Sequence, residues 1–328
     1  MTTPAPHRCL VPTRFAPYPC GLRPVTAGVG ADKGQAGMEV VYHIGAHCTD
    51  DGQLIAALLK NRTALLERGV VVGYPGRYRT PLREAIHSLR GAPASPELQQ
   101  TLLDTIATED RIDRLVLSNE HFLGTTPRAL GGGVLYPLAE ARAASLANLF
   151  PGAGCELHLA IRNPAAFLPA VVGRVRDMDA DTLLAGIDPM ALAWSDVVAR
   201  LRAGAPRAKL VVWCDEDTPL IWPEVLRSVA GAGDDLPLAH GEGRLAEVMS
   251  RDGMARMEAW LAAHPPVSIT HRRRVAAAFL DKYALDEALE EEMDLPGWTA
   301  AHVAALTEAY DADTARIAAM EDVTFLTI

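Results

Sequence analysis

Five side chains with metal-binding or acid–base chemistry lie within nine residues of one another. They are His43, His47, Cys48, Asp50 and Asp51. Imidazole, thiolate and carboxylate groups are the usual ligands of zinc. These five, however, span the end of an apolar segment, a turn and the start of a helical pattern, and they match no zinc-ligand spacing. We therefore predict no metal site here.

The same segment also contains a thiol beside a histidine, which is the pairing used by cysteine nucleophiles. Cys48 follows His47 directly, and His121 is a second candidate base. A reactive cysteine needs an environment that stabilises its thiolate. Asp50 and Asp51 have the opposite effect, because their negative charges raise the pKa of the thiol. The simplest role of these two acids is to cap a helix that begins beside them.

Apolar segments of strand length alternate with helical patterns from Met38 onward. The predicted strands are 39–44, 69–73, 113–118, 156–161 and 208–214. The predicted helices are 52–68, 79–90, 96–109, 136–149, 164–176, 188–203, 219–230, 242–263, 270–282 and 299–320. Continuous apolar strands separated by helices indicate an α/β fold with a mostly parallel sheet and helices on both faces. The C-terminal part is helical, and residues 323–328 have the composition of a final strand.

The first 37 residues differ in composition from the rest of the chain. They contain six prolines and show neither helical nor strand periodicity. This composition predicts disorder. Alternatively, Met38 is the true initiator and the preceding residues come from a start codon assigned too far upstream. A targeting peptide is the rival interpretation, since arginines are present and acids are absent before Asp32, but the prolines oppose an amphipathic helix. Residues 38–328 show no repeat and no clear linker, so we predict a single domain.

Charge and cysteine content narrow the class of protein. The net charge is −10; residues 1–37 carry +3, so residues 38–328 carry −13. So acidic a body is unsuited to binding nucleic acid or an anionic membrane through its whole surface, and no apolar run is long enough to cross a membrane. Five widely spaced cysteines without a CxxC pair favour a reducing cytoplasm. The oligomeric state is not predicted.

Four segments, in the same chain order, resemble the P-loop sulfotransferase superfamily, and in particular its bacterial members. Residues 43–52 read His-Ile-Gly-Ala-His-Cys-Thr-Asp-Asp-Gly, against the family's His-Ile-Gly-x-His-Lys-Thr-Gly-Thr-Thr. Residues 117–120, Leu-Ser-Asn-Glu, resemble its Ser-Ser-Glu segment. Residues 159–164, Leu-Ala-Ile-Arg-Asn-Pro, resemble its Arg-x-Pro strand end, and residues 212–216 end a later strand in a similar way.

The resemblance implies a P-loop fold and a site for 3′-phosphoadenosine 5′-phosphosulfate. The nucleotide would be held by the loop residues Gly45, Ala46, His47, Cys48 and Thr49, and Arg162 would bind its 3′-phosphate. Glu120 and His47 become the candidate catalytic residues, with Glu120 as the general base for an acceptor hydroxyl. The alternative for Arg162 is an ion pair with an acid of residues 215–217.

The sequence differs from the family at the loop positions on which sulfuryl transfer depends. The family's loop lysine, which stabilises charge on the leaving phosphate, is replaced by Cys48. Asp50 and Asp51 put two carboxylates where an anion would enter. Two functions therefore stay open. One is sulfuryl transfer from the phosphosulfate nucleotide to a hydroxyl acceptor, and the other is a non-catalytic relative that binds a small metabolite or a protein partner.

Overall fold

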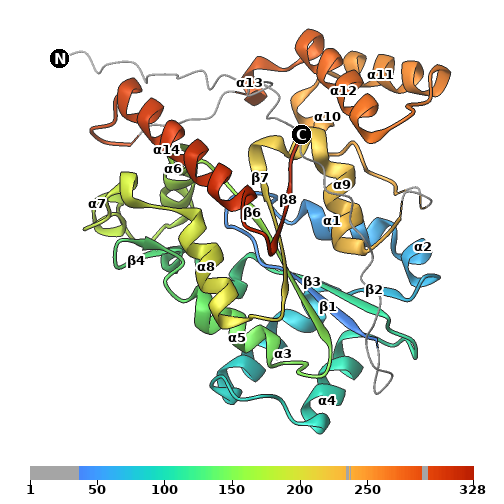
Figure 1. Ribbon diagram of the computed structural model, residues 1–328, viewed down its shortest axis with the longest axis vertical. Helices are drawn as coiled ribbons and strands as arrows, with labels where there is room; N and C mark the ends of the chain where they lie inside the picture. Colours follow the sequence, from blue (N-terminus) through green and yellow to red (C-terminus); the bar gives the residue numbers. More distant parts are fainter. Residues whose placement is uncertain (1–36, 234–235, 237, 290–294) are drawn as a thin grey trace.

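A six-stranded parallel sheet forms the centre of the molecule. The computed structural model describes residues 37–233, 236, 238–289 and 295–328 (Figure 1). The strands lie in the order β2 (Val70–Val72), β3 (Arg114–Ser118), β1 (Glu39–His43), β6 (Gly154–Ile161), β7 (Lys209–Cys214) and β8 (Val323–Leu326). All neighbouring pairs are parallel. The five predicted strands and the strand-like C-terminal tail all take part in this sheet.

Both faces of the sheet are covered by helices, because alternate side chains of each strand point to opposite faces. In β1, Val40 and Tyr42 belong to one buried cluster and Val41 to the other. Helices α1 (Gln53–Lys60), α2 (Arg62–Leu66) and α9 (Thr218–Ala230) pack on the Val41 face. The opposite face is packed by α3 (Pro75–Leu89), α4 (Pro96–Ile106), α5 (Ala139–Ala147), α6 (Pro164–Arg174), α8 (Trp194–Gly204) and α14 (Ala300–Ala318). The predicted α/β class is confirmed.

The helix predicted over 52–68 is interrupted at Asn61, which separates α1 from α2. The Asn61 side chain donates to the carbonyl oxygens of Ala57 at 2.8 Å and Ala239 at 2.9 Å, and it accepts from the Ala239 N–H at 2.7 Å. An asparagine that satisfies a distant backbone segment competes with the helical hydrogen bonds of its own segment. The contact with residue 239 lies far away in the sequence, so periodicity gave no sign of it.

The helix predicted over 136–149 begins only at Ala139. The preceding chain forms a short antiparallel pair, β4 (Leu130–Gly131) and β5 (Val134–Leu135), around the glycines at 132 and 133. Tyr136 follows with a positive φ of 45°, which is a turn conformation rather than a helical one. Its side chain is fully buried and points back to the loop after β1. The tyrosine therefore contributes to the site rather than to helix α5.

The C-terminal helices form a smaller cluster beside α9. Helices α10 (Leu245–Val248), α11 (Arg251–Ala263) and α12 (Ile269–Tyr283) share a buried cluster with Leu220 of α9. After α13 (Asp286–Leu289) and α14 the chain returns to the sheet as β8. The order of elements thus includes a helical C-terminal part and a final edge strand.

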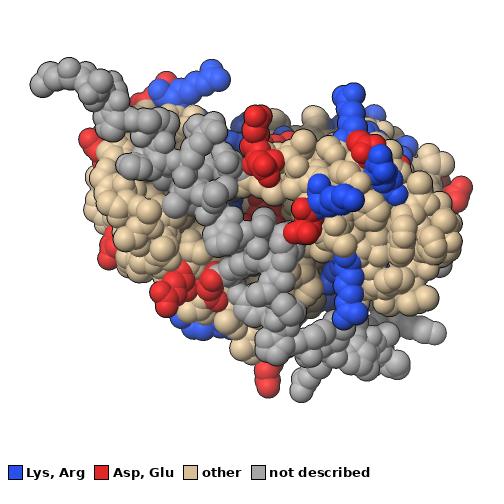
Figure 2. All heavy atoms as spheres, turned by 90° about the horizontal axis from the view of Figure 1, so that it is seen from above, with Lys and Arg blue, Asp and Glu red and all other residues tan. Residues whose placement is uncertain are grey.

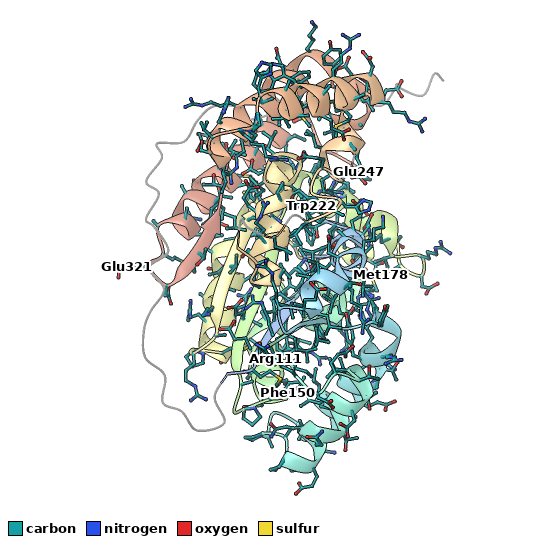
Figure 3. The ribbon with its side chains drawn as sticks, turned by 90° about the vertical axis from the view of Figure 1, so that its right-hand side faces the viewer. Arg111, Phe150, Met178, Trp222, Glu247 and Glu321 are labelled. Atoms are coloured by element: carbon teal, nitrogen blue, oxygen red, sulfur yellow. The ribbon has the colours of Figure 1, made fainter. Side chains whose placement is uncertain are left out.

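The structure bears only in part on the predictions for the N-terminal segment and for membrane-spanning helices. The proposals for residues 1–37 lie outside the described residues, apart from Gly37. Within the described part of the chain, no helix is long and apolar enough to span a membrane. In Figure 3, Arg111 and Phe150 lie in the lower part of the view, toward the side where the strands begin, and Trp222 and Glu247 lie above them.

Candidate functional site

The candidate residues converge at the carboxyl end of the sheet, where parallel α/β folds bind their ligands. His43, the last residue of β1, pairs in register with Ser118 of β3 and His158 of β6. The loop that starts at Ile44 therefore lies between the segments that begin at Asn119 and Arg162. Figure 2 views the molecule from this end, and acidic and basic side chains are interspersed on the visible described surface.

The first residues of the loop continue to pair with β6. The Ala46 N–H donates to the Ala160 carbonyl at 2.9 Å, and the Ala160 N–H donates to the Gly45 carbonyl at 2.8 Å. Gly45 has a φ of 106°, and a Cβ there would lie 3.2 Å from the His47 nitrogen. Only glycine adopts this conformation without strain. The loop is thus held to the sheet by its backbone before it turns into α1.

The side chain of Asp50 is hydrogen-bonded to the first turn of helix α1. Its carboxylate oxygen accepts the Leu54 N–H at 3.0 Å, and the side chain is buried. Thr49 also bonds within the loop, donating its hydroxyl to the Ala46 carbonyl at 2.8 Å. A helix N-terminus stabilises a negative charge through its N–H groups and its dipole. The carboxylate of Asp50 fills that role, although the N-cap residue itself is Gly52. Asp51 does not cap the helix and pairs with Arg174 instead, so the predicted capping role holds for one of the two acids.

Cys48 is buried in the loop and carries no charge at neutral pH. Burial raises the pKa of its thiol to about 11, against the opposing effect of Arg174 and Arg162. The negative charges of Glu120 and Asp51 act in the same direction as burial. A neutral thiol is a poor nucleophile and supplies no cation to a leaving phosphate. Cys48 therefore provides neither a nucleophile nor a cation at this position of the loop.

His47 lies in the interior, between two other side chains. Its Nδ1 is 2.7 Å from the Tyr136 hydroxyl, and its Nε2 is 3.0 Å from Nδ1 of His121. Burial lowers the pKa of His47 to about 3, and electrostatic interactions with His121 and with the Arg174 guanidinium act in the same direction. His47 is therefore neutral, and its Nε2 is hydrogen-bonded to His121, which lies next to Glu120 in the chain.

Arg174, at the end of α6, is a site residue that the sequence did not reveal. Its guanidinium forms ion pairs with Asp51 of the loop and with Glu120, the latter at 3.1 Å. A basic residue in the last turn of a helix is common, since it complements the helix dipole. That ordinary role left no pattern by which to select Arg174. The fold of α6 brings it back to the loop, where it joins two acids from separate elements.

The side chain of Arg162 also contacts the loop, and its partner there is a backbone carbonyl rather than a side chain. One of its guanidinium nitrogens donates to the Cys48 carbonyl at 2.5 Å. Of the acids at 215–217, Glu216 accepts from the Asn163 N–H at 2.6 Å and from the Tyr310 hydroxyl at 3.0 Å. Arg162 and Glu120 thus flank the same loop from β6 and β3, the strands on either side of β1. Their roles as phosphate ligand and general base stay predictions.

Comparison with known proteins adds no family to this geometry. No protein-family model matches the sequence, and no curated protein matches it. Among the described residues, no three or more histidine, cysteine, aspartate or glutamate side chains are grouped so as to hold a metal ion. The functional argument therefore rests on the loop and the charged side chains around it.

Proposed function

We propose that this protein is a sulfotransferase-like binding protein, which holds a small anionic ligand at the carboxyl end of its sheet without transferring a sulfuryl group. The observation that carries the proposal is the position of Asp50. Its carboxylate already accepts a backbone N–H at the start of α1, in the place where the resemblance would put a phosphate of 3′-phosphoadenosine 5′-phosphosulfate. The loop supplies its own anion.

Electrostatics and the identity of residue 48 support the same conclusion. Two like charges 4 Å apart repel by about 4 kcal/mol at an effective dielectric of about 20, which is enough to abolish weak phosphate binding. The neutral thiol of Cys48 gives no compensating cation. A nucleotide entering this loop would meet Asp50 and Asp51 without the loop lysine that the resemblance leads us to expect.

A small anion fits the site better than a nucleotide does, because the side chains of Arg162 and Arg174 both contact the loop. Arg174 is about one-third exposed, and its partner Asp51 is mostly exposed. Ion pairs of this kind contribute little stability and exchange readily. An anionic group that replaces Asp51 beside Arg174 would leave Asp51 free to return to water. We therefore place the ligand between Arg174, Glu120 and the loop.

The alternative is a sulfotransferase in which Arg174 replaces the missing lysine. The observation in its favour is the contact between Arg174 and Glu120, which joins a cation to the candidate general base. A correctly placed base contributes about 10²–10⁴-fold to such a reaction. This alternative requires the nucleotide to displace Asp50 from the helix N-terminus.

Calorimetric titration with 3′-phosphoadenosine 5′-phosphate separates the two functions. We expect no binding to the unmodified protein at millimolar nucleotide, and measurable binding to the triple variant Cys48→Lys, Asp50→Gly, Asp51→Thr. The matched controls are Cys48→Lys alone and the Asp50→Gly, Asp51→Thr pair, which separate the added cation from the removed acids. Melting curves verify that each variant is folded.

Transfer is tested directly by incubating the unmodified protein with 3′-phosphoadenosine 5′-phosphosulfate and a panel of phenols and alcohols. The expected result is no release of 3′-phosphoadenosine 5′-phosphate above the rate without protein. Submillimolar binding by the unmodified chain, or turnover that Glu120→Gln abolishes, would overturn the proposal in favour of the sulfotransferase.

A further inference from the structure

Three side chains form a continuous line of hydrogen bonds from the interior to the site. Tyr136 and His47 are fully buried, whereas about half of the His121 side chain is exposed. The Tyr136 oxygen lies 2.7 Å from Nδ1 of His47, and Nε2 of His47 lies 3.0 Å from Nδ1 of His121. The line begins at a turn after β5, crosses the loop after β1 and ends in the segment after β3.

A fourth contact fixes the direction in which the protons point. The backbone N–H of His47 donates to the Tyr136 oxygen at 2.9 Å, so this oxygen is already an acceptor. The hydroxyl proton of Tyr136 then has Nδ1 of His47 as its acceptor among the described residues. If His47 carried its proton on Nδ1 instead, the buried hydroxyl would have no acceptor there, which is unfavourable. Neutral His47 therefore carries its proton on Nε2.

The same reasoning extends to His121. The Nε2–H of His47 donates to Nδ1 of His121, so that nitrogen is an acceptor and the neutral His121 ring is protonated on Nε2. That N–H is on the site side, where the nearest Glu120 carboxylate oxygen lies 3.9 Å away. Arg174 approaches the same carboxylate at 3.1 Å. A ring held in this form presents a donor to the site and no lone pair.

We propose that Tyr136, acting through His47, holds His121 in the tautomer whose Nε2–H donates into the site, so that His121 binds an oxygen atom of the ligand and does not act as a general base. Tyr136 and His47 are then positioning residues. The identity of the bound oxygen rests on the proposed function, since Arg174 beside His121 favours an oxygen of an anion. The tautomer itself depends only on the hydrogen bonds.

Long-range proton–nitrogen correlation spectra of the full chain, labelled with ¹⁵N-histidine and free of ligand, test the tautomer. We expect His47 and His121 both to be protonated on Nε2 at pH 7.5, with signals assigned from His47→Gln and His121→Gln. Protonation of His47 on Nδ1 would overturn the proposal, and this measurement needs no substitution at Tyr136.

Removal of the tyrosine hydroxyl tests the cause. In Tyr136→Phe, His47 should populate the Nδ1–H form measurably. The matched control is Tyr78→Phe, which removes another buried hydroxyl at this end of the sheet, one that bonds the Ser118 backbone. The control should leave the His47 signals unchanged. An unchanged His47 tautomer in folded Tyr136→Phe would contradict the role assigned to Tyr136.

The ligand contact is tested by titration with inorganic sulfate as the probe. Replacing His121 by Phe should weaken sulfate binding about tenfold or more, because hydrogen bonds to charged groups are among the stronger ones. Replacing it by Gln, which keeps an N–H donor, should restore much of the affinity. Equal affinity for all three proteins would overturn the contact. If the unmodified protein binds no sulfate, the anion-binding function fails, while the tautomer result stands or falls separately.

Discussion

Two clusters of charged side chains lie at opposite ends of the sheet, and they are built differently. Where the strands begin, Arg114 is almost fully buried and pairs with Glu39 and Glu156. It also donates to the backbone carbonyls of Val229 at 3.0 Å and Ser228 at 3.1 Å. Where the strands end, Arg174 is about one-third exposed and pairs with Asp51, which is mostly exposed, and with Glu120, which is about as exposed as Arg174 itself.

The difference separates a structural cluster from one suited to binding. Burial alone would raise the pKa of Glu156, but hydrogen bonds from His158, Arg114 and Lys209 bring it well below its usual range. Removing one member of so buried a group leaves an uncompensated charge in the interior. Around Arg174, water takes the place of any partner that leaves. Only the second cluster exchanges partners at low cost, as a ligand site must.

The sharpest test of this comparison is to remove each arginine. Arg114→Met should lower the free energy of unfolding by about 3–5 kcal/mol, since Glu156 is left buried without its main partner. The matched variant Arg174→Met should cost at most about 1 kcal/mol. Urea unfolding curves at pH 7.5 measure both values. Similar losses at the two ends would show that the Arg174 cluster is as structural as the other.

Acid should destabilise the protein through its buried histidines. Burial lowers the pKa values of His43, His47 and His158, so each takes up its proton more readily when unfolded. Stability is therefore complete above the unfolded pKa of about 6.5 and falls below it, by up to about 1.4 kcal/mol per pH unit for each histidine. For His47 the loss continues down to a pH of about 3.

Unfolding measured between pH 7.5 and 5 checks this prediction. His47→Gln should reduce the slope of stability against pH by roughly one proton. The exposed His87→Gln is the control and should leave the slope unchanged. A slope that is the same in both variants would mean that His47 takes up its proton at about the same pH in the folded and the unfolded protein.

The smallest expected effect distinguishes the two neighbouring acids of the loop. Asp50→Ala removes the acceptor for the Leu54 N–H and should cost about 0.5–2 kcal/mol, as for other capping residues. Asp51→Ala loses only an exposed ion pair and should cost less than about 1 kcal/mol. Thermal unfolding compares the two. A larger loss of stability for Asp51→Ala would indicate that the ion pair between Asp51 and Arg174 stabilises the loop and is not readily replaced by a ligand.

The elements of the fold were predictable because their signals are local. Continuous apolar segments such as 156–161 bury both faces of a parallel strand, and this requirement appears directly in the residue types. The interruption at Asn61 and the late start of α5 were missed for one reason. Both depend on contacts with residues far away in the sequence, namely Ala239 for Asn61 and the loop after β1 for Tyr136.

The sequence by itself determined an α/β fold, and it put Cys48 and two acids into the loop after the first strand, where the resemblance to sulfotransferases leads us to expect a lysine and an open anion site. Only the tertiary structure decided where those groups act. It placed Asp50 on the helix N-terminus, brought Arg174 to Asp51 and Glu120, and buried His47 between Tyr136 and His121. The physical reason is that charge and hydrogen-bond capacity belong to residue types, whereas partners and exposure to water depend on how distant elements pack.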